Sequence, residues 1–260
     1  MKLKLIMFDI GANLTSSHFS KDLDVVLNDS LTAGVKKICV TSSNLDDVKK
    51  AQKITEKYEN LFYSVGFHPH NAKDFKAEFL KDMSIYLDNP KAICLGEMGL
   101  DFNRNFSSKE EQILCFESQL SLANSISKPL FLHQRDAHEE FLSVLDNHKF
   151  NQKLIVHCFT GNLSELEDYL KRDFYIGITG WVCDLKRGNE LRECIKHIPE
   201  DKLLIETDSP YLSPRKKIRR NEPKFLVDVA EEVAKLRNET KESIINSSYE
   251  NSLDFFNLHR

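Results

Sequence analysis

The chain has 260 residues, of which 41% are hydrophobic, and it carries a formal net charge of −4 with a pI near 6.2. The acidic balance excludes a protein that coats nucleic acid by bulk electrostatics, although an enzyme that grips one end of a strand is compatible with it. Six cysteines form no CxxC pair, so we expect buried, reduced thiols rather than a disulfide framework or a zinc finger.

The first apolar stretch of the chain ends at Phe8, where Asp9 interrupts it. Such a stretch is too short for a signal sequence or a membrane span. We therefore expect a cytoplasmic, soluble protein that makes no membrane contact and acts as a monomer.

Short runs of β-branched and aromatic residues recur along the chain between longer segments with helical spacing. They predict strands at Leu3–Ile10, Lys36–Thr41, Leu61–Phe67, Ala92–Glu97, Pro129–His133, Leu154–His157, Phe174–Ile178 and Leu203–Glu206. Helices are predicted at Asn44–Tyr58, Ser107–Ala123, Ala137–Leu145 and Leu163–Leu170, and two more follow Asn221. Ser107 and Glu110 have the spacing of a capping box at the start of one helix.

Eight strands that alternate with helices predict an α/β fold with a parallel sheet, either an open doubly wound sheet or a closed barrel. Eight is the strand number at which closure is natural, and a barrel of this kind takes about 250 residues. Only one glycine, Gly11, follows the first strand, where a dinucleotide-binding fingerprint would need several. We predict a (β/α)8 TIM-type barrel that forms a single domain over residues 1–260.

Acidic, amide and histidine side chains stand at or just after the C-terminal ends of the predicted strands. They are Asp9, Asn13, His68, His70, Glu97, Asp101, His133, Asp136, His157 and Asp208. In a β/α barrel these strand ends meet on the face that carries the active site. We therefore expect residues far apart in sequence to lie in one site.

Glu97, His133 and His157 together offer one carboxylate and two imidazoles, a donor set that suits zinc, manganese, iron or cobalt and, less well, magnesium. Each of these residues alone could be a hydrogen-bonded structural side chain. Packing does not readily explain four titratable groups at the ends of four apolar strands, because isolated charges beside a core are costly. We predict a metal centre of these three residues, with Asp208 placed to bind metal or to accept a proton from the attacking water.

Other residues near the strand ends have both a structural and a functional interpretation. Pro69 fixes the backbone between His68 and His70, which could contact a phosphate, complete a metal shell or cap the next helix; we favour His68 as a substrate contact or transient ligand. Trp181, the only tryptophan, could pack on the rim of the barrel or stack with a nucleobase.

A basic run follows the eighth strand, with five cations among the six residues from Arg215 to Arg220. Such a run is usually a solvated face. Because this one comes soon after Asp208, it could equally attract phosphate groups, and we include Arg219 among the candidate substrate-binding residues.

Four segments resemble the motifs of the TatD-type metal-dependent deoxyribonucleases, in order and spacing over nearly the whole chain. They are GEMGLD at 96–101, HQRDA at 133–137, HCFTG at 157–161 and ETDSPYL at 206–212. The segment DIGAN at 9–13 stands where most members of the family have His-x-His, and it resembles the TatD DNase subgroup.

The resemblance implies a metallo-dependent-hydrolase-like barrel that hydrolyses DNA in the 3′→5′ direction, preferring single strands and accepting RNA as well. It implies a divalent ion, magnesium before manganese or zinc, held by Glu97, His133 and His157. Asp208 is then the catalytic or second-metal carboxylate, and Glu97 also serves catalysis. Because Gly11 and Asn13 replace two histidines, we expect one well-occupied metal.

By the same resemblance, Asn13 and Arg135 join His68, Trp181 and Arg219 as expected substrate contacts. Two alternatives remain. A barrel amidohydrolase or esterase, such as an aminoacyl ester deacylase, often has a lysine at the end of strand four, where Glu97 stands here. A non-catalytic nucleic-acid-binding barrel is favoured by the missing histidines at Gly11 and Asn13.

Overall fold

The structure is a computed structural model that describes residues 5–258, and it divides by internal contacts into two compact units. The central unit is Thr41–His157. The terminal unit combines the described residues up to Val40 with those from Cys158 onward. That residues 1–260 form one domain stays a prediction.

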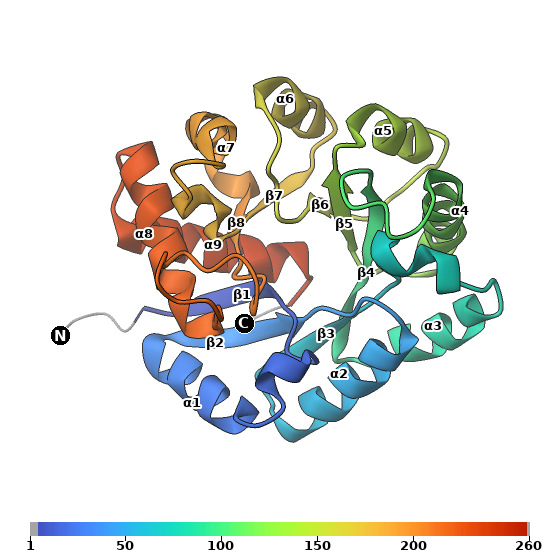
Figure 1. Cartoon of the computed structure of the whole chain (residues 1–260), viewed down its shortest axis with the longest axis horizontal. Coiled ribbons are helices and arrows are strands. Elements are labelled where there is room, and N and C mark those ends of the chain that lie inside the picture. Colours follow the sequence, from blue (N-terminus) through green and yellow to red (C-terminus); the bar gives the residue numbers. More distant parts are fainter. Residues whose placement is uncertain (1–4, 259–260) are drawn as a thin grey trace. The chain divides into compact units, whose positions relative to one another are not determined.

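The central unit contains four parallel strands, each hydrogen-bonded to the next along the chain. These strands are β3 (Leu61–Val65), β4 (Ala92–Asp101), β5 (Leu130–Arg135) and β6 (Leu154–Val156). Its helices are α2 (Leu45–Lys57), η2 (Pro69–Asp74), α3 (Phe79–Leu87), α4 (Lys109–Leu120), η3 (Ala123–Ser125) and α5 (His138–Asp146). All ten residues of β4 are buried, and the α-helices lie along one side of these strands (Figure 1).

The terminal unit contains two parallel strand pairs, β1 (Met7–Ala12) with β2 (Val35–Val40) and β7 (Tyr175–Ile178) with β8 (Leu203–Ile205). Its α-helices are α1 (Leu23–Ala33), α6 (Leu163–Lys171), α7 (Asn189–Cys194), α8 (Leu226–Arg237) and α9 (Lys241–Phe255). Its 3-10 helices are η1 (Ser17–Phe19), η4 (Gly180–Cys183), η5 (Ile195–His197), η6 (Glu200–Lys202) and η7 (Pro223–Phe225).

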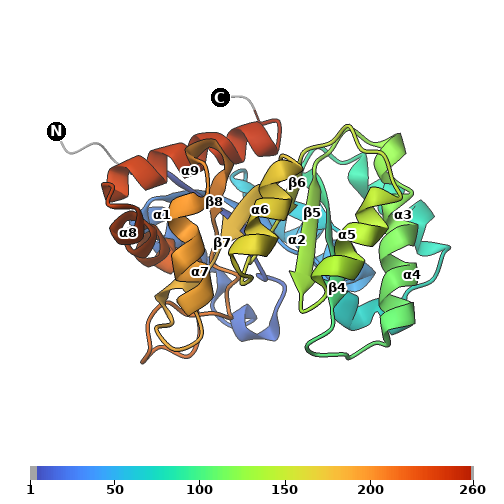
Figure 2. The ribbon, with the colours of Figure 1, turned by 90° about the horizontal axis from the view of Figure 1, so that it is seen from above.

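Helix α9 covers the N-terminal ends of strands in the terminal unit (Figure 2). The ring of Phe256 lies 5.3 Å from that of Phe8, and the ring of Phe255 lies 5.2 Å from that of Tyr175. The Ser248 hydroxyl accepts a hydrogen bond from the Ile205 N–H at 3.0 Å. The loops that leave the C-terminal ends of these strands are therefore on the side away from α9.

The predicted elements are confirmed, with shifts of a few residues at their ends. The largest shift is in β4, which continues to Asp101 instead of ending at Glu97. Gly96 and Gly99 explain the extension, because φ is +140° and +145° and a Cβ would lie within 2.1 Å of a β5 carbonyl oxygen at either site. The first two residues of the predicted strand Leu3–Ile10 lie outside the described residues.

The predicted capping box at Ser107 and Glu110 is wrong by one residue. Ser108 caps α4, and Glu111 completes the box with reciprocal backbone contacts. The hydroxyl of Ser107 instead accepts from the Lys73 N–H at 3.0 Å and donates to the His70 carbonyl at 3.2 Å. Ser107 therefore links the start of α4 to η2.

All six cysteines are free thiols, as predicted, and four of them are buried while Cys158 and Cys183 are half-buried. No helix within residues 5–258 is both long enough and apolar enough to cross a membrane.

Asp9 joins β1 to the segment after β8 and is completely buried. Its Oδ1 accepts from the Thr207 N–H at 2.8 Å, and its Oδ2 is hydrogen-bonded to the Thr207 hydroxyl at 2.5 Å. Burial raises the pKa of Asp9 to about 8, against the opposing effect of these hydrogen bonds. Asp9 is therefore mostly protonated in the folded protein at neutral pH.

Replacing Asp9 with asparagine should flatten the pH dependence of stability. The folded protein keeps this proton up to about pH 8, whereas the unfolded chain releases it above about pH 3.8. The stability that Asp9 contributes is therefore complete below pH 3.8 and falls by about 1.4 kcal/mol per pH unit as the pH rises toward 8. Urea unfolding of the wild type and Asp9→Asn between roughly pH 5 and pH 7 measures the difference in slope. Parallel profiles would show that Asp9 is ionised in the folded protein.

Candidate active site

The central unit places four of the predicted residues at one edge of its sheet. His68 follows β3, Glu97 lies in β4, His133 lies in β5 and His157 comes directly after β6. The register between β4 and β5 pairs Gly99 with His133. Because the strands are parallel, their C-terminal parts bring these side chains together, as the sequence predicts.

The three histidines surround one carboxylate oxygen of the buried Glu97. Glu97 Oε1 lies 3.1 Å from His68 Nε2, 3.0 Å from His133 Nδ1 and 2.7 Å from His157 Nε2. The last two rings also approach each other, with 3.2 Å between His133 Nδ1 and His157 Nε2. A carboxylate and three imidazoles thus form one compact donor cluster.

The surroundings keep Glu97 ionised despite its burial. Burial by itself would raise its pKa, but the charge of His157 and the hydrogen bonds from His133 and His157 hold the pKa well below its usual range. Burial lowers the pKa of His68 to about 4, with Glu97 opposing this change only in part. The cluster therefore combines a carboxylate anion with a neutral His68 at neutral pH.

The hydrogen bonds of His68 identify its tautomer. Its Nδ1 accepts a hydrogen bond from the His70 N–H at 3.0 Å, so the neutral ring carries its proton on Nε2, the atom that faces Glu97. His68, Glu97 and His133 have donor atoms within 4.8 Å of one another. His157 Nε2 also lies 2.7 Å from Glu97 Oε1, so His68 and His157 are both placed to provide a second imidazole ligand.

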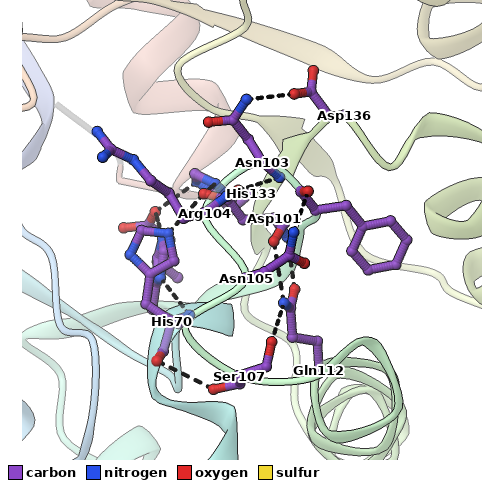
Figure 3. Close-up of polar contacts among 12 residues, drawn as sticks. His70, Asp101, Asn103, Arg104, Asn105, Ser107, Gln112, His133 and Asp136 are labelled. Carbon is purple, nitrogen blue, oxygen red and sulfur yellow. Dashed lines mark hydrogen bonds and ion pairs between the residues drawn. The ribbon is translucent and has the colours of Figure 1, made fainter.

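Asp101 supports the cluster from the end of β4 (Figure 3). Its Oδ2 lies 2.7 Å from His70 Nε2 and 3.6 Å from His133 Nε2. Its Oδ1 accepts from the N–H groups of Asn103 and Arg104 at 2.9 Å each. Burial would raise the pKa of Asp101, but His133, His70 and the Arg104 N–H lower it far below its usual range. One anionic side chain thus orients two histidines and the following loop.

The sequence places Asp101 among the strand-end residues without indicating a role for it, and it offers His70 as a phosphate contact, a metal ligand or a helix cap rather than as a partner of Asp101. Their pairing depends on the extension of β4 past Glu97, which carries Asp101 to the level of η2. Gln112 of α4 fixes this end of the strand, since its Oε1 accepts from the Asp101 N–H at 2.8 Å and its Nε2 donates to the Asp101 carbonyl at 3.1 Å. The spacing of Gly96, Gly99 and Asp101 is the sequence signal that could have revealed the longer strand and the pairing of Asp101 with His70.

The donor set fits a divalent metal ion. His133 Nε2 faces the Asp101 carboxylate at 3.6 Å, so its Nδ1, 3.0 Å from Glu97 Oε1, is the ring nitrogen directed at the cluster. Glu97 is ionised, and imidazole with carboxylate is a typical ligand combination for zinc or manganese. A buried anionic carboxylate with imidazole nitrogens around one oxygen, and a second carboxylate that orients one of the rings, is what a metal ligand site requires.

Asp208 and Asn13 are brought together in the terminal unit. The Asn13 side-chain amide donates to Asp208 Oδ1 at 2.8 Å, and the Asp208 N–H donates to the Gly11 carbonyl at 2.8 Å. Asp208 has a left-handed backbone with φ of 53°. The segment that replaces His-x-His therefore positions the predicted catalytic carboxylate.

The remaining candidates lie at strand ends or in loops. Arg135 is half-buried at the end of β5, and its carbonyl accepts from the Phe102 N–H at 2.9 Å. Trp181 lies in η4, where the Arg187 guanidinium covers its ring at 4.4 Å. Arg219 is exposed in the basic run.

The predicted basic run is not uniformly available to phosphate. Arg215 makes two hydrogen bonds with the Asp228 carboxylate, at 2.8 and 3.2 Å. Arg220 bonds both oxygens of Asp22, at 3.0 and 2.8 Å. These two arginines fasten the loop to α8 and to the residue before α1. Within residues 5–258, Lys216, Lys217 and Arg219 are the exposed cations of the run that make no ion pair.

The family model of TatD related DNases matches residues 8–257 of this chain. The 3′-5′ ssDNA/RNA exonuclease TatD of Escherichia fergusonii is 44% identical over 241 residues, which cover 90% of this chain and 92% of that protein. The protein of the same name from Citrobacter rodentium is 42% identical over 260 residues, covering 97% of this chain and 98% of that protein.

A crystal structure of a TatD-family hydrolase from Entamoeba histolytica has a TM-score of 0.90 and 28% identity, and the match covers 99% of this chain and 100% of that one. The predicted fold class, a (β/α)8 TIM-type barrel, is confirmed by this likeness.

Asp101→Asn should weaken metal binding by about 10- to 100-fold, because the neutral amide no longer orients His133 electrostatically. Calorimetric titration of the metal-free protein with Mn²⁺ measures the dissociation constant. Asp136→Asn is the matched control, since Asp136 is exposed and contacts the Asn103 side chain at 2.6 Å. Equal affinities for wild type and Asp101→Asn would exclude the orienting role.

Proposed function

Because this chain belongs to the family of TatD-related DNases, we propose that it is a metal-dependent 3′→5′ exonuclease of single-stranded DNA that also accepts RNA. The relatives from Escherichia fergusonii and Citrobacter rodentium carry that activity in their names. The observation that supports the proposal most directly is the buried carboxylate of Glu97 with three imidazoles around one of its oxygens.

Glu97, His133 and His157 would hold one divalent ion. When bound, such an ion supplies positive charge that offsets the charge developing on the scissile phosphate and favours ionisation of the attacking water. Magnesium is the proposed ion, while imidazole ligands also suit manganese and zinc. Gly11 offers no donor and the Asn13 amide is bonded to Asp208, which supports a single well-occupied metal position.

The side chains of the site have separate roles in this proposal. His68 presents a protonated Nε2 to the site and would donate a hydrogen bond to a phosphate oxygen of the substrate. Asp208 would accept the proton of the attacking water, with its carboxylate held in place by Asn13. Asp101 fixes the His133 ring, so that the ligand set is formed before the substrate arrives.

Glu97→Gln and His133→Ala should each lower the rate of DNA hydrolysis by more than about 100-fold, since even outer-shell partners of a ligand cost about 10- to 100-fold. The assay digests single-stranded DNA labelled at its 5′ end, with and without EDTA, and then adds back Mg²⁺, Mn²⁺ or Zn²⁺. The product ladder shows the direction of digestion. Glu110→Gln, an exposed change on α4, is the control for folding and purity.

The outcome separates three functions. Loss of activity with EDTA and its return with an added ion supports the exonuclease. Turnover of an aminoacyl ester with intact DNA and RNA would indicate the esterase alternative. Binding of DNA without hydrolysis in any of the three ions would indicate the non-catalytic barrel. A Glu97→Gln protein with wild-type activity would exclude the proposed site.

A further inference from the structure

The terminal unit contains a pocket of about 680 Å³ formed by the segments that follow β7 and β8. Its walls are η4, the turn after η4, the loop from Pro210 to Arg220 and His18 of η1. The two loops lie side by side in Figure 2, and Gly180 permits their close approach, because a Cβ there would lie 2.0 Å from the Leu212 carbonyl oxygen. This volume lies within the usual range of ligand pockets, about 300–1,000 Å³.

The wall of the pocket is strongly positive although the chain as a whole is acidic. Six lysines and arginines line it, against one carboxylate, Asp184. Three of these cations have structural partners: Arg187 with Asp184, Arg215 with Asp228 and Arg220 with Asp22. Lys186, Lys216 and Arg219 make no ion pair with any residue of the described chain. These three side chains are available to an anion.

Aromatic side chains complete the wall. Tyr211 is 52% exposed, and the His18 ring meets it edge-on at 6.4 Å. Arg187 covers one face of the Trp181 ring, and the indole N–H donates to the Arg187 carbonyl at 3.3 Å. Trp181 is thus part of the fixed wall, while Tyr211 offers the more exposed ring. A nucleobase can stack on such a ring whatever its sequence, because every base has a π-face.

Cations beside exposed aromatic rings suit a nucleotide, because a cation can pair with its phosphate and a ring can stack with its base. The pocket also continues directly from the predicted catalytic carboxylate, since the Tyr211 N–H donates to the Asp208 carbonyl at 3.0 Å. We propose that this pocket binds one nucleotide of the single-stranded substrate, stacking its base on Tyr211 and pairing its phosphate with Lys216 and Arg219. The proposal rests on the proposed function, and it assigns the pocket a strand-holding role separate from hydrolysis.

Fluorescence anisotropy of a labelled oligothymidylate tests the pocket with the whole chain in EDTA, where no hydrolysis is expected. Tyr211→Ala should weaken binding at least about fivefold, while Tyr211→Phe should stay within about twofold of wild type. Lys216→Ala and Arg219→Ala should each weaken binding about three- to tenfold and reduce the slope of affinity against salt by about one. Lys217→Ala is the matched control, because Lys217 lies in the same run but does not line the pocket.

Trp181 provides a second readout, since it is the only tryptophan of the chain and lies in the pocket wall. Titration with the oligonucleotide should change its fluorescence saturably, in the wild type and in Glu97→Gln alike. Thymidine monophosphate should compete better than inorganic phosphate. Equal competition by the two would contradict stacking on Tyr211.

The pocket and the proposed function can fail separately. If DNA is hydrolysed but Tyr211→Ala and Lys216→Ala bind as tightly as Lys217→Ala, the pocket proposal is wrong and the exonuclease stands. If Tyr211→Ala and Lys216→Ala weaken oligonucleotide binding as expected but the oligonucleotide is never cut with any added ion, the pocket proposal stands and the exonuclease proposal is wrong. Absence of any binding in EDTA would also overturn the pocket proposal.

Discussion

The buried Glu97 carboxylate is the charge on which the central unit's site depends. A carboxylate with so little exposure stays ionised only where other groups compensate for the lost hydration. Three imidazoles do so here, and they come from the ends of three other strands. The register of those strands therefore determines the distances between the donor atoms. The arrangement is provided by the sheet rather than by mobile loops.

The main features of the fold and the clustering of Glu97, His133 and His157 could be predicted, because both follow from simple periodicities. Apolar runs of strand length give the order of the elements, and parallel strands bring their last residues to the same edge. Glu97, His133 and His157 each stand at such an end. Contacts between loops are harder to predict from the sequence, since they depend on partners that no local pattern indicates. In the sequence, Arg215 and Arg220 look like phosphate-binding cations. In the structure they form ion pairs with Asp228 and Asp22.

The backbone accounts for the other differences. Two glycines with positive φ carry β4 four residues further than the apolar run predicts, and this extension brings Asp101 beside His70. The tautomer of His68 likewise depends on a backbone N–H two residues away. The substitution at Asn13 was predicted to remove metal donors. In the structure its amide also restrains Asp208, so the altered segment positions that carboxylate.

The terminal unit is discontinuous in sequence, with β1 and β2 made early in synthesis and the strands from β7 onward made late. Phe8 contacts Phe256, and Asp9 bonds Thr207, across nearly the full length of the chain. On the ribosome, β1 and β2 must wait for these partners, whereas the central unit is one uninterrupted segment whose strands pair with near neighbours. Bringing together the two segments of the terminal unit closes a loop that contains the whole central unit. A loop of this length costs little extra entropy at equilibrium, but it delays the contacts that depend on its closure. The donor cluster of the central unit can thus assemble on the nascent chain before η4 and the loop from Pro210 to Arg220, which form most of the pocket wall, have been translated.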